Sequence, residues 1–201
     1  MGGDSVDQSK RATLRRFAAL GAASSLVPFA GSDSDSEAPE AIAGYVSATP
    51  GAHFSRIRDD LKLGTGETQH HLRRLEREGT VESHKDGDYR RYYPSGQFDE
   101  FEQAALGVLR RATPRGIVVA LLRDPGATAA DIADGLDVSR PTVSKYAAEL
   151  EEVDLLSRTD GYELTEPERL LLLLVRYAES FGPEAAALAS EASSLVSYDQ
   201  L

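Results

Sequence analysis

The sequence repeats itself at an offset of 75 residues, and this repeat constrains the fold more than any other feature. Pro50-Gly51-Ala52 recurs as Pro125-Gly126-Ala127, and Leu75-Glu76 recurs as Leu150-Glu151. Between these matches, each copy shows the same series of apolar patterns and turn signals. Self-similarity at a fixed offset indicates that one supersecondary unit is used twice. We therefore expect two small domains of the same kind rather than one large domain.

The first copy predicts three helices followed by a hairpin. Apolar or small residues recur at helical spacing in three stretches: Ile42/Tyr45/Val46, Phe54/Ile57/Leu61 and Thr68/Leu72/Leu75. Pro50-Gly51 ends the first stretch, and Leu63-Gly64-Thr65-Gly66 forms a tight turn before the third. Residues 81–94 (VESHKDGDYRRYYP) then predict a β-hairpin, with Asp86-Gly87 in a type I′ turn.

The second copy repeats this order with a shorter hairpin. Its helical stretches are Ile117/Val118/Leu121, Ile132/Leu136 and Val143/Ala147/Leu150. Ser139 is a candidate N-cap for the last of them. The hairpin spans residues 156–164 around Asp160-Gly161. Each copy therefore gives helix, short helix, tight turn, helix and hairpin.

Two stretches carry a family resemblance, GAHFSRIRDDLKLGTGETQHHLRRLEREGTVESHKDGDYRRYYP and ATAADIADGLDVSRPTVSKYAAELEEVDLLSR. They resemble archaeal winged helix-turn-helix transcriptional regulators, in the broad group that includes the arsenical-resistance and multiple-antibiotic-resistance regulators. The resemblance implies a mostly α fold with small β-wings. It predicts a first winged helix-turn-helix at residues 37–96, and a connector helix with a second one at residues 97–165. C-terminal helices follow at residues 166–201, and a separate N-terminal segment precedes at residues 1–36.

Charge is spread unevenly along the chain. The whole sequence has 33 Asp and Glu against 22 Lys and Arg, which gives a net charge of −11. Residues 53–93 nevertheless hold nine cations and eight anions, whereas residues 114–201 hold seven cations and sixteen anions. If any part of the chain contacts phosphate, it is the first of these segments. Few lysines among the cations and an acidic excess suggest a halophile-type composition, for an organism with high internal salt.

The third helix of the first copy and its hairpin supply the candidate DNA-binding residues. A helix fits the major groove of B-DNA, where glutamine pairs with adenine and arginine with guanine. We expect Gln69, His70 and Arg73 to read bases, while Thr65, Arg74 and Arg77 contact phosphates. Lys85, Arg90 and Arg91 flank the hairpin tip and would add wing contacts, although only one face of the hairpin can meet DNA. The alternative is a solvated arginine face that pairs with Glu76 and Glu78.

The second copy has a weaker case for DNA contact. Arg140, Thr142, Ser144 and Lys145 occupy the matching positions at the start of its third helix. Four acidic residues then follow in residues 149–154, and their charges would repel phosphate. Either this helix binds DNA at its tip alone, or the second domain is a structural partner of the first.

The ends of the chain allow several interpretations. Residues 10–16 are basic, and residues 17–32 carry no charge, so the segment 1–36 is either disordered or membrane-targeting. Arg15-Arg16-Phe17 resembles a twin-arginine signal, but lacks the usual residue before the Phe. Near the other end, Leu170 to Val175 are six consecutive apolar residues. They predict a helix that is buried either in the core or in a homodimer interface.

We expect a sequence-specific double-stranded DNA-binding transcriptional regulator, cytoplasmic or membrane-associated through residues 10–32. The alternatives are a winged-helix protein-interaction scaffold and a membrane-tethered regulator. The sequence has no Cys, which excludes thiolate metal sites, and adjacent His70 and His71 diverge on a helix. We expect neither a metal nor a cofactor. GTGETQ lacks the lysine of a phosphate-binding loop, and no nucleophile–base pair is evident, so we do not expect an enzyme.

Overall fold

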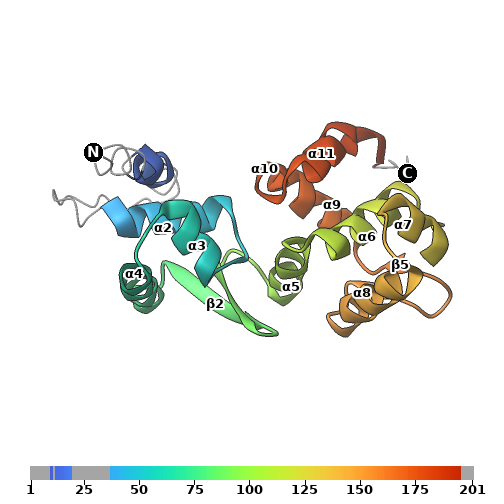
Figure 1. Ribbon diagram of the computed structural model, residues 1–201, viewed down its shortest axis with the longest axis horizontal. Helices are drawn as coiled ribbons and strands as arrows, with labels where there is room; N and C mark the ends of the chain where they lie inside the picture. The colour runs from blue at the N-terminus through green and yellow to red at the C-terminus, as the bar shows by residue number, and fades with distance from the viewer. Residues whose placement is uncertain (1–9, 11, 20–36, 196–201) are drawn as a thin grey trace, which may run out of the picture. The chain divides into compact units, whose positions relative to one another are not determined.

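The computed structural model describes residues 10, 12–19 and 37–195, and the chain divides into two compact units (Figure 1). The first unit ends at Asp99 and the second begins at Glu100. Both units are mostly helical, and each contains a small antiparallel sheet.

From residue 37 onward, the first unit contains three helices beside a β-hairpin and one short additional strand (Figure 1). Its helices are α2 (Glu37–Ala48), α3 (Phe54–Leu61) and α4 (Thr65–Arg77), and its strands are β1 (Ala52–His53), β2 (Val81–Asp86) and β3 (Tyr89–Pro94). The stripes expected from the sequence form its core, because Ile42, Ile57 and Leu72 are almost fully buried. Thr68 is also buried, and its hydroxyl donates to the carbonyl of Gly64 at 2.9 Å. The apolar stripe of α4 therefore points inward, which leaves its opposite face to solvent.

Local signals set the helix boundaries around the turn. His53 is the N-cap of α3, and its Nδ1 accepts a hydrogen bond from the backbone amide of Arg56 at 3.3 Å. Lys62 ends α3 with a left-handed φ of 56°. At the start of α4, the carboxylate of Glu67 accepts from the amide of Gly64 at 3.1 Å. A carboxylate in this first turn also interacts favourably with the positive end of the helix dipole.

The sheet differs from the sequence prediction in its turn and in one extra strand. Its strand order is β1-β3-β2, and β1 was not expected. Asp86 pairs with Tyr89, so the turn residues are Gly87 and Asp88, one position later than predicted. Gly87 has a φ of 55°, whereas Asp88 does not have a positive φ, which contradicts the type I′ turn. Asp86 is held in the ladder instead, where its carboxylate pairs with Arg91.

Residues 12–19 are helical and pack on the first unit, which contradicts the expectation of disorder for this stretch. Leu14 is 6% exposed and belongs to the same core as Ile42. The ring of Phe17 meets that of Tyr45 edge-on at a centroid distance of 5.1 Å. Lys10 also pairs with Glu67 at the start of α4, at 3.4 Å. The remainder of the predicted segment, including residues 20–36, lies outside the described residues.

We expect Leu14→Ala to lower the free energy of unfolding of the first unit by about 2 kcal/mol, because it removes buried methyl groups from a packed core. Urea denaturation of the full chain, followed by circular dichroism, measures the change. Arg16→Ala is the matched control, since it truncates an exposed side chain on the same helical stretch and should change the stability by less than about 0.5 kcal/mol. Equal stabilities of the two variants would show that Leu14 does not belong to the folded core.

The second unit repeats the helical arrangement with a much smaller hairpin. Its elements are α5 (Glu100–Leu109), α6 (Ala112–Arg123), α7 (Ala129–Gly135), α8 (Arg140–Glu152), β4 (Leu156–Ser157) and β5 (Glu163–Leu164). Ser139 caps α8 as predicted, because its hydroxyl accepts from the amide of Thr142 at 3.3 Å. Val143, Ala147 and Leu150 point into the core. The two copies thus share one order of elements but differ in the length of their wings.

The C-terminal helices pack within the second unit. They are α9 (Pro167–Arg176), α10 (Ala178–Phe181) and α11 (Pro183–Leu195), and α9 contacts α5, α6 and α11. Leu170, Leu171, Leu173 and Leu174 are buried there, which agrees with the core alternative. Leu172 is 63% exposed, so the helix is not buried on all sides as its sequence suggested. Homodimerisation through these helices stays a prediction, which analytical ultracentrifugation would test.

Candidate nucleic-acid interface

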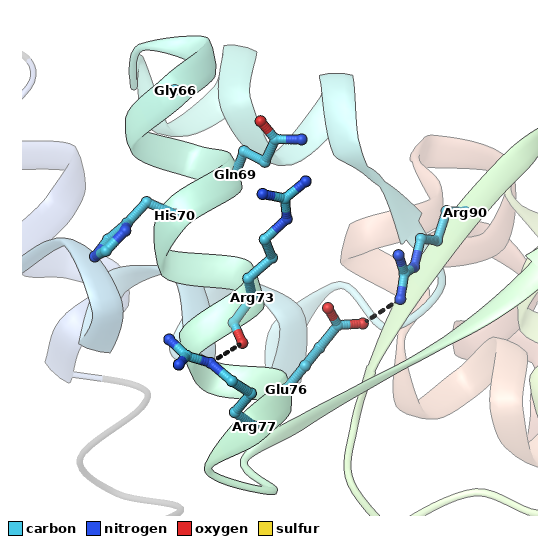
Figure 2. A pocket seen from close by; sticks show the side chains of 7 residues that line it. All are labelled: Gly66, Gln69, His70, Arg73, Glu76, Arg77 and Arg90. Carbon is cyan, nitrogen blue, oxygen red and sulfur yellow. Dashed lines mark hydrogen bonds and ion pairs between the residues drawn. The ribbon is translucent and has the colours of Figure 1, made fainter.

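The outward face of α4 and one strand of the wing enclose a shallow depression of about 740 Å³. Seven residues line it: Gly66, Gln69, His70, Arg73, Glu76, Arg77 and Arg90. Figure 2 shows Gln69, Arg73 and Glu76 in one row along α4, with Glu76 reaching toward Arg90 on the wing. Their spacing of i, i+4 and i+7 places them on one side of the helix. His70 projects from another side of α4 in the same view.

Arg73 and Arg77 are the exposed cations of this helix. Within the described part of the chain, neither guanidinium pairs with a carboxylate; Arg77 donates through Nε to the carbonyl of Arg73 at 3.3 Å. Gln69 and His70 are also exposed, and so is Thr65 at the first position of α4. The structure therefore brings Gln69, His70, Arg73 and Arg77 together at the depression, whereas Thr65 and Arg74 do not line it.

Arg74 differs from its neighbours because it has a carboxylate partner. Its Nε lies 2.7 Å from Glu78, four residues further along the chain. This is the intrahelical pairing that the alternative interpretation predicted for the arginine face. The pairing holds for Arg74 and does not extend to Arg73 or Arg77 among the described residues.

The two neighbouring arginines of the wing, Arg90 and Arg91, have opposite environments. Arg90 remains exposed on β3 opposite Lys85 on β2, which is also exposed. Arg91 faces the interior with a side chain that is 2% exposed. It donates to Asp86 and, through Nη1, to the carbonyl of Gly51 at 3.0 Å. The prediction that Arg91 contacts DNA is therefore wrong, because its guanidinium is already used inside the protein.

His53 lies beside β3 of the wing and connects it to α3. Its ring lies 5.0 Å from that of Tyr89, and it pairs with Arg91 across β1 and β3. Burial, followed by the charges of Arg91 and Arg56, lowers the pKa of His53 below its ordinary value, while Asp59 opposes this shift. A neutral ring is also required for Nδ1 to accept the capping hydrogen bond from Arg56.

Acidification should therefore destabilise the first unit through His53. Because the pKa of His53 is lower in the folded than in the unfolded state, its contribution to the free energy of unfolding is present above pH 6.5. This contribution decreases as the pH falls below that value. The measurement is the free energy of unfolding between about pH 8 and about pH 5. His53→Asn keeps a capping acceptor but does not titrate, so its pH dependence should be shallower than that of the wild type. An identical slope in both proteins would exclude His53 as the source.

The matching surface of the second unit is more acidic and more internally paired. Arg140 and Ser144 are exposed on α8, and Thr142 is half-buried beside the Ser139 cap. Lys145 lies 3.8 Å from Glu149, whose other oxygen accepts from Arg111 at 2.5 Å. On the short hairpin, Arg158 pairs with Glu151. The structure therefore places all four predicted residues on α8. Of its two cations, Lys145 has a carboxylate partner and Arg140 has none among the described residues.

The described residues contain no group of three or more His, Asp or Glu side chains placed to hold a metal ion. The rings of His70 and His71 are inclined at 77° to one another. Among the same residues, no helix is both long enough and apolar enough to cross a bilayer. Membrane association through residues 10–32 stays a prediction.

Comparison with known families agrees with this architecture. Residues 36–106 match a family model described as an N-terminal HTH domain, and residues 110–156 match a winged helix-turn-helix DNA-binding model. No curated protein and no solved structure matches the chain. The chain therefore has two consecutive helix-turn-helix domains followed by C-terminal helices.

These domains define the class of protein, that of DNA-binding transcriptional regulators. Such domains point to regulation rather than catalysis. Neither family description names the arsenical-resistance or multiple-antibiotic-resistance group, so that resemblance, with the archaeal and halophilic origin, stays a prediction.

Proposed function

We propose that the first unit recognises specific sequences in double-stranded DNA by placing α4 in the major groove. Gln69 and Arg73 read base edges there, since both amide and guanidinium groups pair bidentately with purines. His70 and Thr65 add contacts along the same helix. The observation that supports this proposal is the exposed row of α4 with Arg73 and Arg77, which have no carboxylate partner among the described residues.

Phosphate contacts come from Arg77, Arg74, Lys85 and Arg90 in this proposal. Lys85 and Arg90 lie opposite one another on the wing, and Arg90 lines the same depression as Arg77. Contacts to phosphate fix the register of a protein on DNA, while base contacts specify sequence. Arg74 would exchange its pairing with Glu78 for a phosphate oxygen.

The second unit plays a secondary part in DNA binding. Arg140, Thr142, Ser144 and Lys145 are at the N-terminal end of α8, where the helix dipole also favours an anion. The carboxylates of Glu149 and Glu151 follow on the same helix. We therefore assign to the second unit phosphate contacts at the N-terminal end of α8. The protein would make these contacts in the cytoplasm.

Binding of the full chain to duplexes chosen from a randomised library tests this function. Fluorescence anisotropy should show that the selected duplex binds about a thousandfold more tightly than a scrambled one, or better. The logarithm of the binding constant should fall linearly with the logarithm of salt concentration, with a slope of roughly −0.9 for each phosphate neutralised. Equal affinity for selected and scrambled duplexes, or no selectable duplex at all, would contradict sequence-specific binding and leave the protein-interaction scaffold as the better interpretation.

A further inference from the structure

Three side chains join α4 to both strands of the wing, and we call them the wing clasp: Glu76 of α4, Ser83 of β2 and Arg90 of β3. The Ser83 hydroxyl donates to Oε1 of Glu76 at 2.6 Å. Arg90 donates through Nε to the Ser83 hydroxyl at 2.7 Å and through Nη2 to the same Glu76 oxygen at 2.8 Å. The three groups therefore close a hydrogen-bonded triangle. Figure 2 shows the link between Glu76 and Arg90 across the depression.

The position of Glu76 is unexpected for a surface that binds an anion. Its side chain is 20% exposed and lines the same depression as Arg73 and Arg77. A carboxylate at this place repels phosphate, and its pairing also reduces the charge that Arg90 presents. Since attraction of phosphate alone would favour a neutral residue here, the contribution of Glu76 must lie in the geometry that it imposes.

We propose that Glu76 and Ser83 are positioning residues that hold Arg90, and with it the wing, at a fixed place beside the recognition helix. This inference rests on the proposed function of α4. Arg90 keeps 61% of its side chain exposed, so it can contact DNA while the clasp is closed. A long arginine side chain loses rotamer freedom when it binds, and a side chain that is ordered beforehand loses less.

The clasp orders the side chain of Arg90 and also fixes the distance between α4 and the wing. Arg73 on α4 reads a base in the groove, while Arg90 contacts the backbone beside it. Because Ser83 and Arg90 come from different strands, the triangle fixes both strands of the hairpin relative to α4. A fixed spacing between base contact and backbone contact favours the duplex whose groove width matches it. The clasp therefore raises the preference for the correct sequence rather than the affinity for DNA in general.

Two variants of the full chain disrupt the clasp, and one matched control leaves it intact. Glu76→Ala removes the shared acceptor, whereas Ser83→Ala removes two of the three hydrogen bonds without any change of charge and leaves the ion pair between Arg90 and Glu76. Glu78→Ala is the control, because it removes the same charge from the end of the same helix, together with the partner of Arg74. Each variant is compared with the wild type for affinity to the selected and the scrambled duplex at one salt concentration, after circular dichroism has shown that it is folded.

We expect the ratio of selected to scrambled affinity to fall about tenfold in Glu76→Ala and at least threefold in Ser83→Ala, the size of effect that one misplaced contact brings. In Glu78→Ala both affinities should rise together and the ratio should stay at the wild-type value. The proposal is overturned if Glu76→Ala behaves like Glu78→Ala. It is also overturned if Ser83→Ala keeps the wild-type ratio, because Glu76 would then act on DNA without the clasp.

A measurement on the protein without DNA separates failure of the clasp from failure of the proposed function. Relaxation of the arginine Nε signals by nuclear magnetic resonance should show a rigid Arg90 in the wild type, a more mobile one in Ser83→Ala and the most mobile one in Glu76→Ala, with Arg73 as the mobile reference. A wild-type Arg90 as mobile as Arg73 overturns the clasp itself. A rigid Arg90 in a protein that prefers no duplex overturns DNA recognition and the positioning role together.

Discussion

Replacing Arg91 by alanine should lower the free energy of unfolding of the first unit by about 3 kcal/mol, because a large buried side chain and its hydrogen bonds are lost. The Arg91 side chain is 2% exposed and donates to the carboxylate of Asp86 and to the carbonyl of Gly51. Both acceptors lose this donor in the variant, and the space left by the guanidinium is not refilled. Native-state hydrogen exchange of the full chain measures the loss through the amides of β3.

Arg90→Ala provides the matched control, since the two arginines are adjacent and have opposite environments. Arg90 is exposed, and exposed ion pairs add little stability, so its loss should change the free energy of unfolding by less than about 1 kcal/mol. The same substitution should weaken DNA binding, if Arg90 contacts the backbone. Comparable destabilisation by both substitutions would show that Arg91 is not the buried anchor of the wing.

The helices of the first unit could be predicted because their periodicity is strong. Ile42, Ile57 and Leu72 were assigned to helical stripes from spacing alone, and all three are buried. An amphipathic helix has one face that must leave water, so its sequence also marks the face that remains outside. For this reason the exposed row of Gln69 and Arg73 followed from the same pattern.

The wing could not be predicted to the same detail, because strand register depends on a single turn residue. Moving the turn from Asp86-Gly87 to Gly87-Asp88 changes which residues lie opposite one another. Each residue of β2 then faces a residue two positions further along β3, so the cross-strand partners change while the faces of the strand stay the same. Alternation placed Arg90 and Arg91 on opposite faces of the hairpin, but it did not show which face packs inward; the structure shows that Arg91 is the buried one. A signal for Ser83 was available, because alternation along β2 places it on the face of Lys85, which is also the face of Arg90.

The N-terminal segment shows a different limit of local patterns. A basic stretch before uncharged residues is typical of targeting signals, and nothing in its own sequence indicates a folded contact. Its Leu14 and Phe17 pack on Tyr45 and its neighbours, which are far along the chain. Only the tertiary structure reveals that Leu14 and Phe17 have a packing surface around Tyr45. The same holds for α9, where burial of four leucines was predicted but exposure of Leu172 was not.

Arg73→Ala should weaken the free energy of binding to the selected duplex by about 1–3 kcal/mol and relax the sequence preference at one base pair. Arg73 is exposed in the middle of α4 and lines the depression that would receive the base edge. A guanidinium pairs with two acceptors of guanine, and alanine leaves that base unread. The measurement is anisotropy with the selected duplex and with duplexes substituted at each position.

Arg77→Ala separates reading of a base from attraction of a phosphate. Arg77 lies one turn further along α4 and carries the same charge, but the proposal gives it a backbone contact. Its loss should weaken binding to every duplex by a similar factor and make the salt dependence shallower by about one unit of slope. Arg73→Ala should instead affect the selected duplex far more than the scrambled one. If Arg73→Ala lowered both affinities equally, Arg73 would be a phosphate contact, and the sequence preference would have to come from Gln69, His70 or the shape of the groove.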